Sequence, residues 1–305
     1  MKKHSRATLW ALAAALVVMV GTGSSAQVGQ QLGQIRHNAG DNVVPVFEGW
    51  EKNPDGTFNL VFGYMNRNYV EEPELAIGPD NNVSPGPADQ GQPTHFYPRR
   101  QQFMFKVKVP ADFGRKEVVW TLTRNGRTEK AYGTLLMVEE LTAVVYSENR
   151  GGLGNDSVTA KPNQPPTISI DGGAMRTVAV GETVTLTASA ADDGIPTPPP
   201  ARGRGAGAAT AVVDGVPLLT TRERPTTQAI VKPSRQGLAV TWTHWRGAGK
   251  LTFEPMNVVV KDGKATTKVA FNQPGTHVIR AFADDGILST PADVTIIVTG
   301  AAKSP

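Results

Sequence analysis

The sequence predicts an all-β protein made of two tandem β-sandwich domains, the second of them immunoglobulin-like. Short runs in which apolar and polar residues alternate recur along the chain, and stretches rich in Asn, Asp, Pro and Gly separate them. Neither half of the chain shows a sustained helical period after its first 26 residues. A length of 305 residues is enough for two ordinary domains.

Residues 1–26 have the pattern of a secretory signal peptide. Three basic residues within the first six precede the apolar run 9–20, which is too short to span a bilayer, and Ser24-Ser25-Ala26 is a small-residue cleavage site. No second apolar run follows. We therefore expect the mature chain to be exported, to lie in the periplasm or outside the cell, and to have no transmembrane segment.

Charge and cysteine content exclude several classes of function. The whole chain holds 31 Lys and Arg against 27 Asp and Glu, and the signal peptide accounts for three of the basic residues and for no acidic one. The mature chain is therefore almost neutral and has no general field to attract nucleic acid. Because the chain has no cysteine, it has no disulfide and no thiolate zinc site, so apolar cores must hold each domain.

The first β-sandwich domain is expected at residues 43–148, after a flexible lead at residues 27–42. Asn53-Pro54-Asp55-Gly56 and Asn125-Gly126 are strong turn signals. The stretch 84–100 has too many prolines and glycines for a helix or a central strand, so we interpret it as a polar crossover between sheets. The expected strands are Val43–Trp50, Phe58–Met65, Glu74–Ile77, Gln102–Val109, Val118–Thr123 and Thr128–Val138.

A three-part motif in this domain resembles a pattern of secreted bacterial β-modules. The parts are Gly63–Asn68 (GYMNRN), Gly78–Asn82 (GPDNN) and 84–100, which ends GQPTHFYPRR. The family pattern reads roughly GYxNxN, GxNN and GQPTxFxPGR. The resemblance implies an exported or surface-associated β-domain and brings no catalytic residue with it. Arg99 stands where that pattern has glycine, so we expect the turn there to differ in shape.

A second domain is expected at residues 165–300, after a Gly-, Asn- and Pro-rich linker at residues 149–164. Roughly seven strands, with Trp242 on the third, favour an immunoglobulin-like sandwich. The domain resembles the PKD-like and Ig-like modules of bacterial exported proteins, which implies that His277 stands where such folds often hold a corner tyrosine. The expected strands are Thr167–Ile170, Glu182–Ala190, 238–243, Thr252–Val260, Ala265–Phe271, Thr276–Ala283 and Asp293–Val298.

An insertion at residues 195–237 departs from that family. It begins with a Pro-, Arg- and Gly-rich tract and carries six Lys and Arg against two acidic residues. It has no aromatic side chain on which a base could stack. We therefore expect a disordered, solvated loop rather than a site for an acidic polymer.

No catalytic constellation stands out, and we do not expect an enzyme. No serine lies in a G-x-S-x-G elbow. The histidines of the mature chain, His37, His95, His244 and His277, share no ligand-type spacing, so no histidine metal site is predicted. Aromatic residues flank His95 and His244, which are expected to be packing residues.

The most specific pattern is the pentapeptide Ala-Asp-Asp-Gly-Ile, which occurs at residues 191–195 and again at 283–287. In an immunoglobulin-like sandwich both copies lie where strands end at the same pole. Their carboxylates could bind calcium there, and no other cofactor is expected. The alternative is ordinary turn chemistry, which we favour because a turn needs one Asp-Gly and calcium needs about six oxygens. The four candidate ligands are Asp192, Asp193, Asp284 and Asp285.

The combined features predict an exported, non-catalytic binding or structural module of the bacterial cell envelope or extracellular space. Its expected partner is a protein or polysaccharide of the envelope. Two alternatives remain open: an accessory subunit of a periplasmic or secreted enzyme complex and, less favoured, a divergent hydrolase. Trp120 and Trp242 are assigned to cores, whereas Trp50 and Trp245, beside turns, are candidates for stacking on a polysaccharide.

The N-terminal pattern predicts Gln27 as the first residue of the exported protein. N-terminal sequencing of protein recovered from the envelope fraction should therefore begin at Gln27. Exported protein that still carries Met1 would remove the basis for the predicted compartment.

Overall fold

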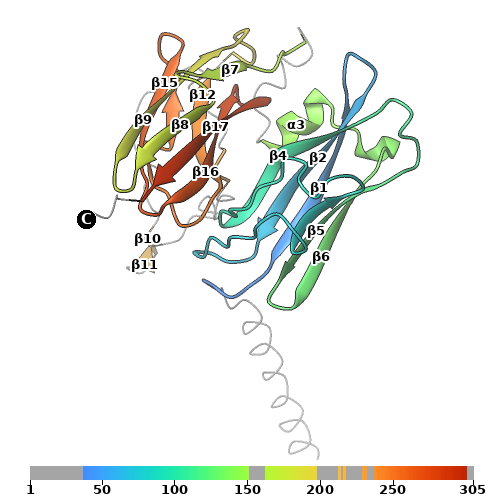
Figure 1. Ribbon diagram of the computed structural model, residues 1–305. Helices are drawn as coiled ribbons and strands as arrows, with labels where there is room; N and C mark the ends of the chain where they lie inside the picture. The colour runs from blue at the N-terminus through green and yellow to red at the C-terminus, as the bar shows by residue number, and fades with distance from the viewer. Residues whose placement is uncertain are drawn as a thin grey trace, which may run out of the picture. The chain divides into compact units, whose positions relative to one another are not determined.

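The chain is all-β, as predicted (Figure 1). Asn38–Pro305 forms one compact unit, and its described helices are the short η2 (Met137–Glu139) and α3 (Ala143–Asn149). No helix in the described part of the chain is long and apolar enough to cross a membrane. The expected signal peptide, most of the flexible lead and most of the linker lie outside the described residues. The residues that the computed structural model describes are 37–150, 162–197, 212–213, 216–217, 229–231 and 237–300.

The first half is a sandwich of two three-stranded antiparallel sheets around an apolar core. The sheet orders are β1-β2-β4 and β3-β5-β6. At the centre of the core the rings of Phe62 and Phe105 stack with their centres 5.4 Å apart, and Trp120 lies edge-on to both. The strands are β1 (Val43–Lys52), β2 (Phe58–Asn66), β3 (Asn81–Ser84), β4 (Arg99–Val109), β5 (Val118–Arg124) and β6 (Arg127–Gly133).

Both predicted hairpin turns of this half are confirmed. Between β1 and β2, the carboxylate of Asp55 accepts the backbone N–H of Thr57 at 3.0 Å. Between β5 and β6, Asn125 and Gly126 have φ values of 53° and 73°. Two successive positive values are what the right-handed twist of a two-residue hairpin requires, and Asn and Gly adopt them at low cost.

One expected strand, Glu74–Ile77, is not formed, and another is shorter than predicted. The segment Glu74–Ile77 makes a single bridge to His95, because Pro73 at its start cannot donate a ladder hydrogen bond. β6 ends at Gly133 rather than at Val138, since the chain leaves the sheet there and turns into η2. β3, which contains the Asn81-Asn82 part of the motif, was not predicted.

Buried amides of the motif hold its irregular segments. Asn66 and Asn81 are fully buried, and each side-chain amide donates to two backbone carbonyl groups. Asn81 bonds the carbonyls of Leu75 and Pro93 and accepts the indole N–H of Trp120 at 3.0 Å. Because a proline-rich crossover has few backbone donors of its own, these amides satisfy carbonyl groups that a sheet ladder would otherwise satisfy.

Arg99 adopts a backbone conformation that favours glycine, the residue of the family pattern at this position. The expected difference in turn shape stays a prediction. The φ of Arg99 is 66°, in the left-handed region that favours glycine. Its guanidinium lies 4.0 Å from the ring centre of Tyr69 and donates to the carbonyl of Arg67. These contacts compensate for the strained backbone.

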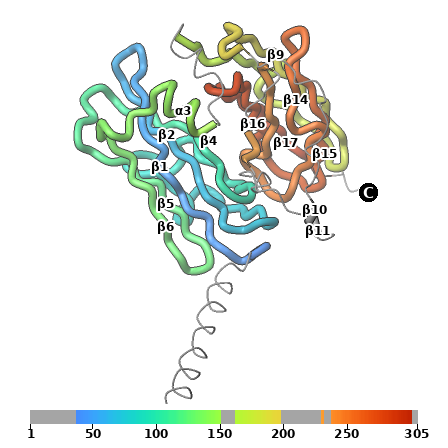
Figure 2. The backbone as a smooth tube through the Cα atoms, turned by 180° about the vertical axis from the view of Figure 1, so that it is seen from behind, coloured from blue at the N-terminus to red at the C-terminus, as the bar shows by residue number. Residues whose placement is uncertain are grey.

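The second half consists of a five-stranded and a four-stranded sheet (Figure 2). Their orders are β14-β12-β16-β17-β8 and β13-β15-β9-β7, which is the strand order of an immunoglobulin-type sandwich with β14 and β8 added at the edges. The strands are β7 (Thr167–Ile170), β8 (Met175–Ala179), β9 (Thr183–Ala191), β12 (Ala239–Arg246), β13 (Phe253–Glu254), β14 (Asn257–Val259), β15 (Lys264–Ala270), β16 (Gly275–Asp284) and β17 (Ser289–Thr299). A separate short pair consists of β10 (Val212–Val213) and β11 (Val216–Pro217).

The strands expected in this half are present, with two changes. β8, which pairs in parallel with the end of β17, was not predicted. The strand expected at Thr252–Val260 divides at Pro255 into β13 and β14, which belong to opposite sheets. Proline cannot continue a ladder, so the chain crosses from one sheet to the other at this point.

Trp242 and His277 occupy the positions that the fold predicts. Trp242 is fully buried in the core. His277, at the start of β16, places Nε2 3.3 Å from the carbonyl oxygen of Gln273, four residues upstream. A corner tyrosine makes the same kind of backbone bond in this fold. Gly247 packs closely on the imidazole, because a Cβ there would lie 2.6 Å from Nδ1 of His277.

The insertion at residues 195–237, expected to be disordered, is packed where it returns to the sandwich. Ile230 and Val231 are buried in the core of the first half, and the backbone N–H of Ile230 donates to the side chain of Gln101 at 2.9 Å. The prediction is wrong for these two residues, because their apolar side chains bury surface that a solvated loop would expose. Much of the rest of the insertion lies outside the described residues.

Replacing Asn81 with alanine should lower the free energy of unfolding by about 3 kcal/mol, since two buried carbonyls and an indole N–H lose their partner. The matched control is Asn82→Ala, because Asn82 is half-buried and its amide bonds the carbonyl of Pro79. Urea unfolding followed by tryptophan fluorescence measures both. A loss no larger for Asn81→Ala than for Asn82→Ala would contradict the role assigned to Asn81.

Candidate functional site

The motif segment 84–100 of the first half contacts the end of β12 in the second half. The pairing of β12 with β16 shifts between His244 and Arg246, so Trp245 is an extra residue in a β-bulge. A bulge bends the strand and redirects its side chains. Here it brings the carbonyl of Trp245 to the motif segment, where it accepts the backbone N–H of Thr94 at 3.1 Å.

Trp245 is the central side chain of this junction. Its indole N–H donates to the carbonyl of Gly91 at 3.2 Å, the guanidinium of Arg280 lies 3.8 Å from its ring centre, and Phe282 packs edge-on against it. Trp245 is only 2% exposed. It is therefore not free to stack on a polysaccharide, which corrects that expectation, whereas the half-buried Trp50 remains a candidate.

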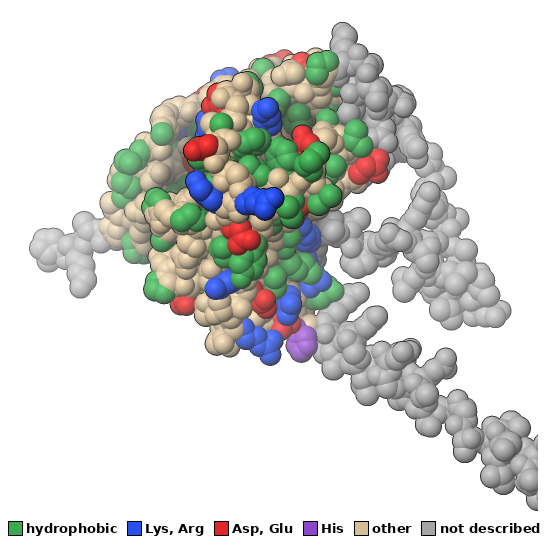
Figure 3. Space-filling model, turned by 90° about the vertical axis from the view of Figure 1, so that its right-hand side faces the viewer, with side chains coloured by type: hydrophobic (Ala, Val, Ile, Leu, Met, Phe, Trp, Pro, Cys, Tyr) green, Lys and Arg blue, Asp and Glu red, His purple; other side chains and the backbone are tan. Residues whose placement is uncertain are grey.

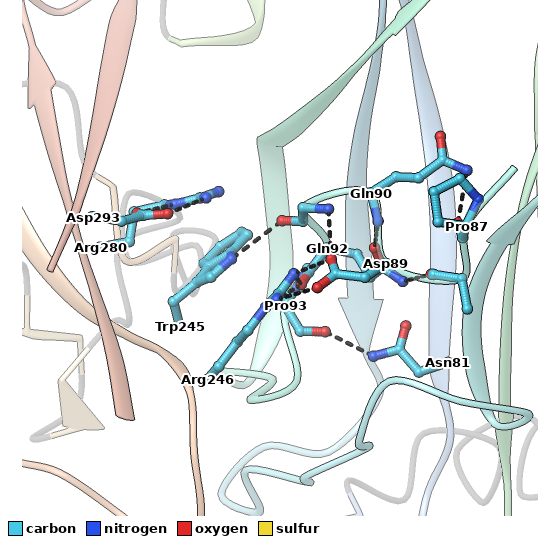
Figure 4. A network of polar contacts seen from close by, with 12 residues as sticks. Asn81, Pro87, Asp89, Gln90, Gln92, Pro93, Trp245, Arg246, Arg280 and Asp293 are labelled. Carbon is cyan, nitrogen blue, oxygen red and sulfur yellow. Dashed lines mark hydrogen bonds and ion pairs between the residues drawn. The ribbon is translucent and has the colours of Figure 1, made fainter. Parts of the chain in front are cut away.

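Arg246 adds a fork of hydrogen bonds to the same loop (Figure 4). Its guanidinium donates to both carboxylate oxygens of Asp89, at 2.7 and 2.8 Å, and to the carbonyl of Gln92. These bonds lower the pKa of Asp89 below its ordinary value. Because a bidentate pair requires a specific geometry, it fixes the position of the loop on β12.

Three histidines from distant parts of the sequence form a buried cluster in the same junction. The ring centres of His95 and His244 are 4.6 Å apart, and those of His244 and His277 are 5.5 Å apart. Glu72 bonds His95 at 2.9 Å and Lys250 at 2.5 Å. His95 and His244 are packing residues, as predicted, but no spacing in the sequence indicates that the three rings meet.

The histidine cluster has the composition of a metal site without its geometry. Within the described ranges, no group of three or more His, Asp or Glu side chains is placed to hold a metal ion. Burial, and to a lesser degree the two neighbouring histidines, lowers the pKa of His244 to about 3. Burial also lowers the pKa of His277. Both rings are therefore neutral at pH 7, and they pack the junction without charge.

Both Ala-Asp-Asp-Gly-Ile loops form the same pair of turns. In each loop the first aspartate accepts the N–H of the glycine and the second accepts that of the isoleucine. Both loops meet the incoming chain, because Asn163 donates to Asp285 and the backbone N–H of Gln164 donates to Asp193, each at 3.1 Å. The loops thus share the pole expected for them. Calcium binding by Asp192, Asp193, Asp284 and Asp285 stays a prediction.

The two loops differ in their charge partners. Asp284 is 1% exposed and forms an ion pair with Arg150, which directly follows α3. Burial raises the pKa of Asp284, and the guanidinium of Arg150 opposes that rise. Burial also raises the pKa of Asp285, to about 6. No cation among the described residues pairs with Asp192, the counterpart of Asp284 in the first loop.

Ile287 makes the second loop an apolar anchor between the halves. It is fully buried in a small cluster with Val61, Phe103, Leu141 and Tyr146, all from the first half. One copy of the pentapeptide therefore supplies a turn, a buried charge and an apolar contact at the junction. No local feature of its five residues distinguishes it from the other copy.

A groove of about 180 Å³ lies between β4 and the strands β16 and β17. Aromatic side chains, among them Phe105 and Phe282, form much of its lining. The two cations on its walls already have partners, since Lys106 pairs with Glu51 and Arg280 with Asp293. The groove is therefore a small apolar recess without a free charge.

No known family model matches this sequence, and no curated protein matches it. Similar solved structures include the Clostridium thermocellum CbhA fibronectin(III)-like modules, at 14% identity and a TM-score of 0.24, covering 87% of this chain and 97% of that chain. The D00-D0 domain of intimin is 12% identical with a TM-score of 0.24, and the match covers 84% of this chain and 100% of that chain. The S-layer protein rSbsC is 12% identical with a TM-score of 0.25, and the match covers 87% of this chain and 28% of that chain. The immunoglobulin-type assignment therefore rests on the order of the chain's own strands.

Replacing Asp284 with asparagine should lower the free energy of unfolding by about 3–5 kcal/mol, because it leaves the buried charge of Arg150 without its partner. The matched control is Asp192→Asn, the same position in the other pentapeptide, which should cost less than about 1 kcal/mol. Urea unfolding at pH 7 measures both variants. Equal losses would show that the pair with Arg150 does not stabilise the junction.

Proposed function

We propose that this chain is an exported, non-catalytic binding or structural module of the bacterial cell envelope or extracellular space. The observation that supports this most is that the three-part motif has a structural role. Its polar residues are buried in hydrogen bonds that shape the crossover and attach it to the second sandwich. Such a motif makes a fixed pair of β-sandwiches, which suits a protein that presents its surface in a constant geometry.

The surface favours a protein or polysaccharide partner. On the face drawn in Figure 3, basic and acidic side chains are interspersed and apolar side chains lie between them. At η2, Met137 and Val138 are 87% and 92% exposed, and Leu136 beside them is 57% exposed. The indole of Trp50 donates to the carbonyl of Leu136. We call residues 136–138 with Trp50 the η2 ridge, and exposed apolar groups of this kind are typical of binding surfaces.

An accessory subunit of a periplasmic or secreted enzyme complex is the second candidate. It uses the same features, with the η2 ridge binding the catalytic partner. A divergent hydrolase is less favoured. The clustered histidines bond one another, Glu72 and the carbonyl of Gln273 rather than a nucleophilic hydroxyl.

Cell fractionation and capture test this proposal. The full chain with a C-terminal tag should be recovered from the periplasm or the medium, while a variant without residues 2–26 should stay in the cytoplasm. Cross-linking in the envelope fraction should capture a protein or polysaccharide. Met137→Glu should reduce that capture at least tenfold, because it places a charge in the η2 ridge, whereas Met175→Glu, at an exposed methionine of β8, should not.

Two results would contradict the proposal. One is retention of the unmodified chain in the cytoplasm. The other is turnover by the purified protein in a screen of ester, peptide and glycoside substrates. Equal capture by the two methionine variants would contradict the assignment of the η2 ridge as the binding surface.

A further inference from the structure

The hydrogen bonds of the junction define one arrangement of protons on His244 and His277. Nε2 of His277 faces the carbonyl oxygen of Gln273 at 3.3 Å, so this nitrogen carries a proton and donates it. Nδ1 of His277 then holds a lone pair, which accepts the N–H at Nε2 of His244 at 3.4 Å. Nδ1 of His244 is left as a buried lone pair with no hydrogen-bond partner among the described residues. Both rings are neutral in this arrangement.

If either ring takes up a second proton, the new N–H group has no hydrogen-bond acceptor within the described ranges. On Nδ1 of His277 it would point at the N–H of His244. On Nδ1 of His244 it would be buried at a nitrogen for which the described part of the chain supplies no hydrogen-bond partner. Either event places a cation beside another imidazole in a site that is at most 2% exposed, and a buried cation without a partner is strongly unfavourable.

Nearby carboxylates oppose this conflict without removing it, because burial lowers the pKa of His244 and of His277 by more than Glu72 and Glu74 raise them. Glu72 and Glu74 face His95, at 2.9 and 4.0 Å from its two ring nitrogens, rather than His244. Glu72 is also paired with Lys250. The other titratable groups at the junction are Arg246, paired with Asp89, and Tyr97, whose hydroxyl accepts the backbone N–H of His244.

The cluster lies at the contact between the halves. His95 belongs to the motif segment, whereas His244 and His277 belong to β12 and β16. Moving the motif segment away from β12 would uncover His244, which packs against His95, and would let His244 turn away from Nδ1 of His277, so that either ring can take its second proton. The conflict is therefore removed by opening the junction, and the ladders within each sheet need not break.

We propose that the junction is an acid-sensitive latch. Protonation of His244 and His277 weakens the contact of residues 89–97 with the end of β12, so that the junction opens as the pH falls while the sheets of both halves persist. This regulation does not depend on the proposed export or on the identity of a partner.

Proton linkage determines in which direction a change of pH shifts the equilibrium between the open and the closed junction. His244 has a pKa of about 3 in the closed junction and an ordinary value of 6.5 when exposed. Between these values the open form binds more protons, so acidification favours opening, and the closed form is fully favoured only above the ordinary value. For His244 alone, the ratio of open to closed forms rises about twenty-five-fold from pH 7 to pH 5. His277 changes the ratio in the same direction.

Hydrogen–deuterium exchange of the full chain at pH 7 and pH 5, corrected for intrinsic rates, tests the proposal. Peptides that cover residues 93–97 and 243–247 should lose protection by about twenty-five-fold or more. Peptides from β9 and β15 should keep theirs. An equal loss in all peptides, or no loss at the junction, would overturn the proposal.

Histidine variants show whether the loss of protection at low pH comes from His244 and His277 or from other titratable groups. His244→Gln and His277→Gln should each reduce the difference between pH 7 and pH 5, while His37→Gln, at an exposed histidine, should leave it unchanged. The difference stays informative even if a variant is less stable at pH 7. If neither variant folds, NMR titration of the unmodified chain decides, because ordinary titration midpoints for both His244 and His277 would overturn the proposal.

Discussion

The structure depends on the burial of both faces of the sheet that contains β12. One face packs on the four-stranded sheet through Val240 and Trp242, and the other contributes Trp245 and Phe282 to the core of the first half. β12 is consequently buried from Ala239 to Trp245. The hydrophobic gain from covering the second face holds the halves together, so the contact is part of the fold and not an addition to two finished domains.

Polar groups then decide where the halves meet. The fork between Arg246 and Asp89 and the bond from the indole of Trp245 to Gly91 each require one position of the crossover on β12. Such bonds add modest stability, because water offers similar partners to the separated groups. Their effect is to exclude other alignments. The prolines of the crossover assist, since they restrict the loop before it docks and so reduce the entropy that it loses when it is fixed.

Local signals predicted the elements well, and long-range contacts could not be predicted. The two residues Asn125 and Gly126 are enough to predict the hairpin between β5 and β6. By contrast, the alternation along β12 indicates a half-buried strand with Val240 and Trp242 inside, and nothing nearby shows that Thr241 and Thr243 are covered as well. The histidine cluster and the pair of Arg150 with Asp284 join residues far apart in the sequence, so only the packed chain reveals them.

The core of the first half includes side chains that come much later in the chain. Ile230, Val231, Trp245 and Phe282 all belong to it. A chain synthesised from its N-terminus cannot complete this core until residue 282 has emerged. Until then, the apolar side of β1 to β6 that these residues cover is exposed to water. During that interval the early sandwich is prone to associate with other chains. The N-terminal half is therefore the first to be made, yet it stays unfinished until most of the second half has also been made.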